Sequence, residues 1–110
     1  MPLNIGSLLK PMVNAAKKVF GDKWPEVKSF TEMQFKNLAQ TAIMIGKLQA
    51  EDKITREQAK YLWEMQKNAA QAVLLAVEGM GIILVQNAIN AALGTVKDVI
   101  NKALGWKLIA

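Results

Sequence analysis

Histidine and cysteine are both absent from the 110 residues of this chain, and each absence excludes several kinds of site. Without histidine, the commonest general base and the commonest ligand of transition metals are missing. Without cysteine, thiolate nucleophiles, disulfides, zinc–thiolate sites and iron–sulfur clusters are excluded. The sequence also contains no phosphate-binding loop, dinucleotide fingerprint or nucleophile elbow. We therefore expect a protein that is not an enzyme and that uses no cofactor and no metal.

Arginine is almost absent, although the chain is basic, with 14 Lys and Arg residues, 9 Asp and Glu residues and a net charge of +5. Arg56 is the only arginine, and arginine is the residue that contacts phosphate and guanine through paired hydrogen bonds. The lysines are scattered along the chain, and only Lys17 and Lys18 are adjacent. This distribution indicates a hydrated basic surface, so we expect no specific nucleic-acid partner.

A secretion signal is also missing at the start of the sequence. The first ten residues lack a basic region followed by an apolar region and a cleavage site. A chain without cysteine suits a reducing compartment. We therefore expect a cytoplasmic protein, with membrane association as the alternative.

Proline and glycine are sparse, at three and seven residues, whereas apolar residues make up 52% of the chain. This composition provides for a hydrophobic core, and 110 residues is the usual size of one domain. Apolar residues recur at helical spacing, as at Phe35, Leu38, Ala42 and Ile45, in steps of 3, 4 and 3. The sequence predicts an all-α fold with a single helical domain over residues 1–110.

Three helices are predicted, over residues 8–20, 26–50 and 55–104. The first helix is basic, with Ser7 as its candidate N-cap and Gly21 just after its end. Thr55 and Gln58 have the spacing of a capping box, which marks the start of the third helix. A short charged turn precedes Thr55, so the second and third helices should form an antiparallel hairpin. Gly105 provides the stop after the third helix.

The centre of the segment 55–104 allows two interpretations. Residues 72–85 are apolar on all sides of the helix except at Glu78. At Gly79 and Gly81 the chain either turns, which gives an antiparallel four-helix bundle, or contains a kink or a close crossing within one helix. Because apolar residues flank both glycines and loops at bundle ends are normally polar, we favour one continuous helix.

A continuous helix of about 50 residues would be roughly 75 Å long, far longer than a domain of this size. The two shorter helices would leave much of its apolar surface uncovered, so that surface must meet another subunit or lipid. We therefore expect a structural or adaptor protein that assembles through the long helix, as a coiled coil or an oligomeric helical bundle. The partner would be a second copy of the chain or another helical protein. The residues expected to carry packing between helices or chains are Met33, Phe35, Leu38, Ile45, Leu62, Met65, Leu74, Val77, Ile82, Val85, Ile89, Leu93, Val96 and Ile100.

Glu78 is the only formal charge between Asn68 and Val96. It either reaches the polar side of its helix and stays hydrated, or forms a buried carboxylate that is hydrogen-bonded across a subunit interface.

The same region, residues 69–96, is the candidate for membrane insertion, and a small membrane-active protein is the alternative function. Several Gln and Asn side chains in this region argue against a span that faces lipid. Binding of a small ligand in an apolar cavity has no sequence support beyond the methionines.

Overall fold

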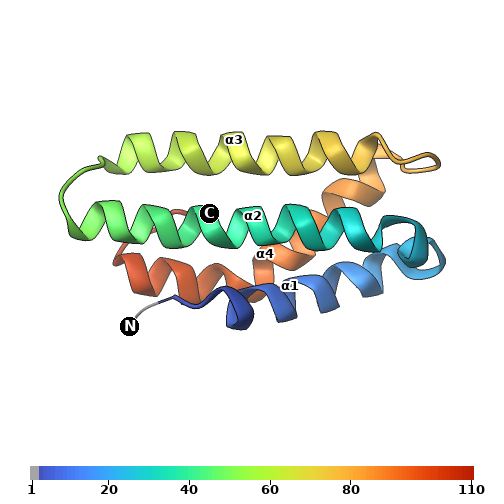
Figure 1. Cartoon of the computed structure of the whole chain (residues 1–110), viewed down its shortest axis with the longest axis horizontal. Coiled ribbons are helices and arrows are strands. Elements are labelled where there is room, and N and C mark those ends of the chain that lie inside the picture. The colour runs from blue at the N-terminus through green and yellow to red at the C-terminus, as the bar shows by residue number, and fades with distance from the viewer. Residues whose placement is uncertain (1–2) are drawn as a thin grey trace.

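A computed structural model describes residues 3–110, and within them the chain forms four α-helices and one short 3₁₀ helix (Figure 1). Successive α-helices run in opposite directions along the long axis of the molecule. The described residues contain no strand, so the predicted all-α fold is confirmed. The elements are α1 (Ile5–Phe20), η1 (Gly21–Lys23), α2 (Trp24–Ala50), α3 (Arg56–Leu75) and α4 (Ile82–Leu104).

The prediction of one continuous helix over residues 55–104 is wrong, because α3 ends at Leu75 and α4 begins at Ile82. Gly79 has a φ of +85°, a left-handed conformation that glycine adopts without steric cost. Gly81 is the extended residue immediately before α4. The two glycines therefore belong to a turn between helices and mark neither a kink nor a close crossing within one helix.

Some of the apolar residues around the turn face inward, whereas Ile82 and Ile83, which follow it, are 50% and 66% exposed. Val77 and Met80 are half-buried and pack against the hydrophobic core. The side chain of Lys23, in the connection between α1 and α2, donates a hydrogen bond of 2.9 Å to the carbonyl of Gly79. A polar partner for the turn thus comes from a distant part of the chain, and local sequence gives no sign of it.

Most other helix ends agree with the prediction to within a few residues. The capping box at the start of α3 is confirmed, since Thr55 and Gln58 exchange two hydrogen bonds of 3.0 Å between side chain and backbone. Gly105 follows α4 in the left-handed conformation, as predicted. The first helix begins earlier than predicted because its N-cap is Asn4, whose side chain accepts from the backbone N–H of Ser7.

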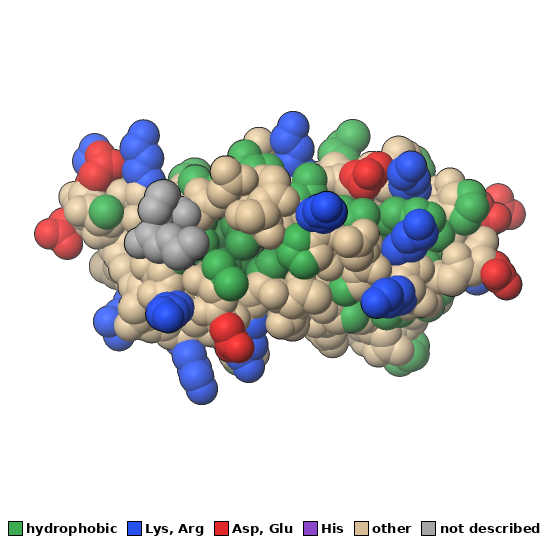
Figure 2. All heavy atoms as spheres, turned by 90° about the horizontal axis from the view of Figure 1, so that it is seen from below, with side chains coloured by type: hydrophobic (Ala, Val, Ile, Leu, Met, Phe, Trp, Pro, Cys, Tyr) green, Lys and Arg blue, Asp and Glu red, His purple; other side chains and the backbone are tan. Residues whose placement is uncertain are grey.

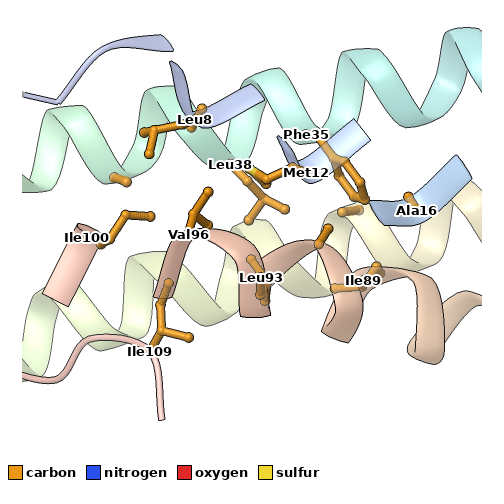
Figure 3. Close-up of a cluster of buried hydrophobic side chains, with 14 of the residues drawn as sticks. Leu8, Met12, Ala16, Phe35, Leu38, Ile89, Leu93, Val96, Ile100 and Ile109 are labelled. Carbon is orange, nitrogen blue, oxygen red and sulfur yellow. The ribbon is translucent and has the colours of Figure 1, made fainter. Parts of the chain in front are cut away.

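The core lies where α1, α2 and α4 meet, and α3 packs mainly on α2 (Figure 1). Side chains from the three core helices point toward one another in Figure 3, among them Met12 from α1, Leu38 from α2 and Val96 from α4. Because α4 folds back onto α1 and α2, its own chain buries most of its apolar stripe. The premise that this segment is one long helix that its own chain cannot cover is therefore wrong, and contact with another subunit or with lipid stays a prediction.

The turn also divides the candidate membrane segment, residues 69–96, between α3 and α4. Among the described residues, no helix has both the length and the hydropathy needed to span a bilayer.

Candidate interaction surfaces

The residues predicted to pack between helices or chains fall into three groups. Met33, Met65 and Ile82 are 50–60% exposed. Leu62 and Val77 are half-buried against the core. The others are buried within the chain, namely Phe35, Leu38, Ile45, Leu74, Val85, Ile89, Leu93, Val96 and Ile100. The buried group is already packed within the chain, so only the exposed and half-buried members can contact another molecule.

Glu78 lies in the turn between α3 and α4 and is exposed. Within the single chain this carboxylate is therefore hydrated, as in the first of the two alternatives, and its burial across a subunit interface stays a hypothesis. Within residues 3–110, no three acidic side chains come close enough together to hold a metal ion.

The outer side of the α2–α3 hairpin carries a stripe of uncharged residues on each helix. On α2 the stripe follows steps of 3, 4, 4, 3 and 4, and on α3 it follows steps of 4, 3, 4 and 3, with Tyr61 beside it. Each set of steps corresponds to one face of a helix. We call the two stripes together the uncharged face; it consists of Phe30, Met33, Asn37, Thr41, Met44 and Leu48 on α2, and Gln58, Tyr61, Leu62, Met65, Ala69 and Ala72 on α3.

Both stripes face the same way because both helices use their opposite sides to meet α4. On α2, Gly46 and Gln49 lie against Leu104 at the end of α4. On α3, Trp63 and Lys67 border a groove whose other wall is α4. The stripes are about half a helical turn away from these contacts, so in the antiparallel hairpin they form one continuous surface.

The uncharged face exposes large apolar side chains. Phe30, Met33, Met44, Tyr61 and Met65 are between 44% and 68% exposed. None of the twelve positions of the face is Asp, Glu, Lys or Arg. Since single exposed apolar residues are common but contiguous patches are rare on monomers, this face is a candidate for contact with another protein.

The other side of the molecule is basic. Figure 2 looks at the side that carries α1 and α4, where Lys and Arg side chains outnumber Asp and Glu around a central apolar strip. Within α1, Lys10, Lys17 and Lys18 are exposed, and the helix contains no acidic residue. The net charge of +5 is therefore unevenly distributed, with an uncharged side and a lysine-rich side.

A groove of about 640 Å³ lies between α3 and α4, which contact each other much less than α2 and α3 do. Its floor is apolar and includes the buried side chains of Trp63, Leu93 and Ile109. Its rim carries four lysines and a single acidic residue, Glu64. We call this feature the lysine-rimmed groove; the four lysines are Lys60, Lys67, Lys97 and Lys107.

Residues 105–110, which follow α4, close one end of the groove. Asn101 fixes them, since its side-chain oxygen accepts from the backbone N–H groups of Leu108 and Ile109 at 3.0 Å and its amide donates to the carbonyl of Ile109 at 2.8 Å. The indole N–H of Trp106 donates to the side-chain oxygen of Gln49. The segment thus ties α4 back to α2 and places Ile109 in the groove floor.

The lysines of the groove have no carboxylate partner. Across residues 3–110, the only ion pair joins Lys53 to Glu51, at 3.2 Å, in the turn between α2 and α3. Lys67 and Lys97 line the groove and are half-buried, which is typical of lysines whose alkyl stems pack on an apolar surface while the ammonium groups stay in water. The groove therefore combines apolar walls with an excess of positive charge, and none of its lysines forms an ion pair within the described chain.

Sequence reasoning identified part of the uncharged face, at Met33, Leu62 and Met65, and missed the groove. The missed signal is the run of Trp106, Leu108 and Ile109 directly after the glycine that ends α4. Apolar residues after a helix stop indicate a segment that packs back onto the fold. The position of the groove depends on how far α3 and α4 diverge, which is a property of the tertiary structure.

No known protein family, no curated protein and no solved structure matches this chain. Its function is therefore argued from two surfaces, the uncharged face and the lysine-rimmed groove.

Proposed function

We propose that the protein is a non-enzymatic structural or adaptor protein that assembles by pairing the uncharged face of its α2–α3 hairpin with the same face of a second copy. The observation that supports the proposal is the concentration of five exposed large apolar side chains on a surface without charge. Methionine and tyrosine, which supply four of the five, are enriched in protein interfaces.

The absence of charge favours a second copy as the partner. In a two-fold symmetric pair, the same patch of each subunit faces its equivalent, so a patch of one charge would repel itself. An uncharged patch has no such repulsion. The lysine-rich side, in contrast, would oppose pairing of two chains that each carry a net charge of +5.

The area of the uncharged face is sufficient for a dimer with a small interface. Two helices side by side, each about 20 residues and so roughly 30 Å long and about 10 Å across, present roughly 600 Å². Two copies would then bury about 1,200 Å², which is the lower end of the range for specific interfaces. Because α4 is buried within its own chain, the hairpin replaces the long helix as the route of assembly.

Light scattering of the purified chain between about 1 and 100 μM tests the proposal. We expect a dimer that the double variant Met33→Lys/Met65→Lys converts to a monomer, because four ammonium groups would lie in one desolvated interface. The matched control is Ile83→Lys/Val99→Lys, which makes the same chemical change at two exposed positions outside the face. The control should remain dimeric.

A monomeric parent chain at the highest concentration would refute the proposal. Equal dissociation of the test and control variants would also refute it, since net charge and not the uncharged face would then govern association. Circular dichroism of both variants establishes that they keep the helical content of the parent.

A further inference from the structure

We infer that the lysine-rimmed groove between α3 and α4 binds a small anionic amphiphile, that is, a carboxylate or a phosphate monoester that carries an unbranched alkyl tail. The inference is independent of the proposed assembly, because the groove and the uncharged face lie on different sides of α3.

The floor of the groove fits an alkyl tail. Trp63 and Leu93 are buried beneath it, and Leu108 and Ile109 extend the apolar surface from the segment after α4. Gly94 lines the groove next to Leu93, and a Cβ at this position would meet no atom within 4 Å, so the groove is open there. In the proposed complex the unbranched tail lies across Gly94 in this open space, which we call the channel.

The rim fits a negatively charged head group. Its side chains carry a net charge of +3, four lysines minus one glutamate, and the main-chain carboxylate of Ala110, which also lines the groove, reduces the local net charge to +2. No carboxylate of the described residues lies within ion-pair distance of these lysines. Of the four lysines, Lys60 already lies with its ammonium 6.0 Å from the centre of the Trp106 ring. An anion would therefore gain attraction without displacing a carboxylate, and the groove walls screen that attraction less than open solvent does.

The volume favours a small molecule over a partner helix. A groove of about 640 Å³ lies within the range of roughly 300–1,000 Å³ that is typical of small-molecule sites. A helix about 10 Å across occupies roughly 120 Å³ per residue, so the groove would hold only about five of its residues, less than two turns. A single alkyl tail of about ten carbons matches the groove better.

Calorimetry with decanoate and with decyl phosphate, both as monomers below their micelle concentrations, tests the inference. Inorganic phosphate serves as the head group alone, and decyl maltoside serves as an uncharged molecule with the same tail. We expect both anionic amphiphiles to bind with one site per chain, and both partial probes to bind at least about tenfold more weakly. Chemical shifts of the Gly94 and Asn90 amides report whether the ligand occupies the groove.

Two pairs of variants locate the site. Lys67→Gln/Lys97→Gln should weaken decanoate binding about tenfold, whereas Lys17→Gln/Lys18→Gln, which removes the same charge from α1, should change it less than about twofold. Gly94→Leu should abolish binding by filling the channel, and Gly94→Ala should leave it within about twofold. Neither change at Gly94 threatens folding, because alanine and leucine both favour a helix over glycine.

Four results would overturn the inference. The first is equal binding of decyl phosphate and inorganic phosphate, and the second is binding only to vesicles of anionic lipid and not to the monomeric probes. The third is equal weakening by the two lysine pairs, and the fourth is unchanged binding in a folded Gly94→Leu variant. A dimerisation defect in the hairpin variants has no bearing on these results, so failure of one proposal is distinguishable from failure of the other.

Discussion

The ammonium group of Lys23 donates a hydrogen bond of 2.9 Å to the backbone carbonyl of Gly79, which lies 56 residues away in the sequence. Lys23 ends the connection between α1 and α2, and Gly79 lies in the turn between α3 and α4. The bond therefore joins the two connections at one end of the molecule. It also supplies a hydrogen-bond donor at the point where the left-handed Gly79 interrupts helical hydrogen bonding.

Replacement of Lys23 by methionine should remove this bond and keep most of the apolar stem. Because the bond is largely exposed, we expect a loss of about 0.5–1 kcal/mol in the free energy of unfolding, measured with urea. Lys28→Met is the matched control, since Lys28 is exposed on α2 and makes no hydrogen bond from its side chain among the described residues. An equal effect of the two changes would show that the bond contributes nothing to stability.

The two glycines of the turn should respond oppositely to substitution. Gly79→Ala should lower the free energy of unfolding by about 1–2 kcal/mol, because a Cβ is disfavoured at a φ of +85° and would lie 3.3 Å from the ammonium of Lys23. Gly81→Asp should raise it by about 0.5–1 kcal/mol, because α4 has no side-chain cap and no acidic residue in its first turn.

Urea unfolding of both glycine variants also tests the turn against the continuous helix. If the chain were helical through residues 75–82, Gly79→Ala would be stabilising by about 1 kcal/mol, since alanine is the better helix former. Stabilisation by Gly79→Ala would therefore contradict the four-helix arrangement in Figure 1.

The sequence predicted the features that depend on neighbouring residues. The capping box of Thr55 and Gln58 and the stop at Gly105 involve groups within a few positions of one another, so local spacing was sufficient. The turn at Gly79 could not be predicted in this way, because inward packing of Val77 and a bond from Lys23 compensate for its apolar composition. Because the turn was missed, the third helix was predicted to be too long. The prediction that its own chain cannot cover its apolar surface followed from that excess length.

The two candidate surfaces also differ in how far local sequence predicts them. Periodicity alone places Met33 and Met65 on helix faces, but it does not say whether such a face is buried or exposed. Only the tertiary packing, in which α1 and α4 cover other sides of the hairpin, leaves this side open. The groove depends still more on tertiary structure, since Lys67 and Lys97 come from helices whose separation no local pattern specifies.

Asn101 should be needed to hold the segment after α4. Asn101→Leu removes three hydrogen bonds to Leu108 and Ile109, and we expect a loss of about 2–3 kcal/mol in the free energy of unfolding. Asn101→Asp keeps an acceptor for the two N–H groups but loses the donated bond, so its effect should be smaller. Hydrogen exchange at the amides of Leu108 and Ile109 should accelerate in both variants, and more in Asn101→Leu.

Exposed Asn87 in α4 provides the control for this change, because its side chain makes no hydrogen bond among residues 3–110. Asn87→Leu should alter the free energy of unfolding by less than about 0.5 kcal/mol. Unaltered exchange at Ile109 in Asn101→Leu would show that apolar packing alone holds the segment in place.

Replacement of Thr31 by an isosteric apolar residue should stabilise the core. Its side chain is 0% exposed, and its hydroxyl finds no hydrogen-bond partner among the described residues. A buried hydroxyl without a partner loses its hydration and gains nothing in return. Thr31→Val keeps the shape and removes the hydroxyl, so we expect a gain of about 1 kcal/mol in the free energy of unfolding.

Thr41→Val is the matched control in the same helix, because the hydroxyl of Thr41 donates a hydrogen bond of 2.9 Å to the carbonyl of Asn37. This change removes a satisfied bond and should give no gain in stability. Thermal and urea unfolding of both variants provide the comparison. If Thr31→Val proved as neutral or as destabilising as Thr41→Val, the hydroxyl of Thr31 would have to be satisfied in solution, by water or by a shift of α2 against α1 that exposes this part of the core.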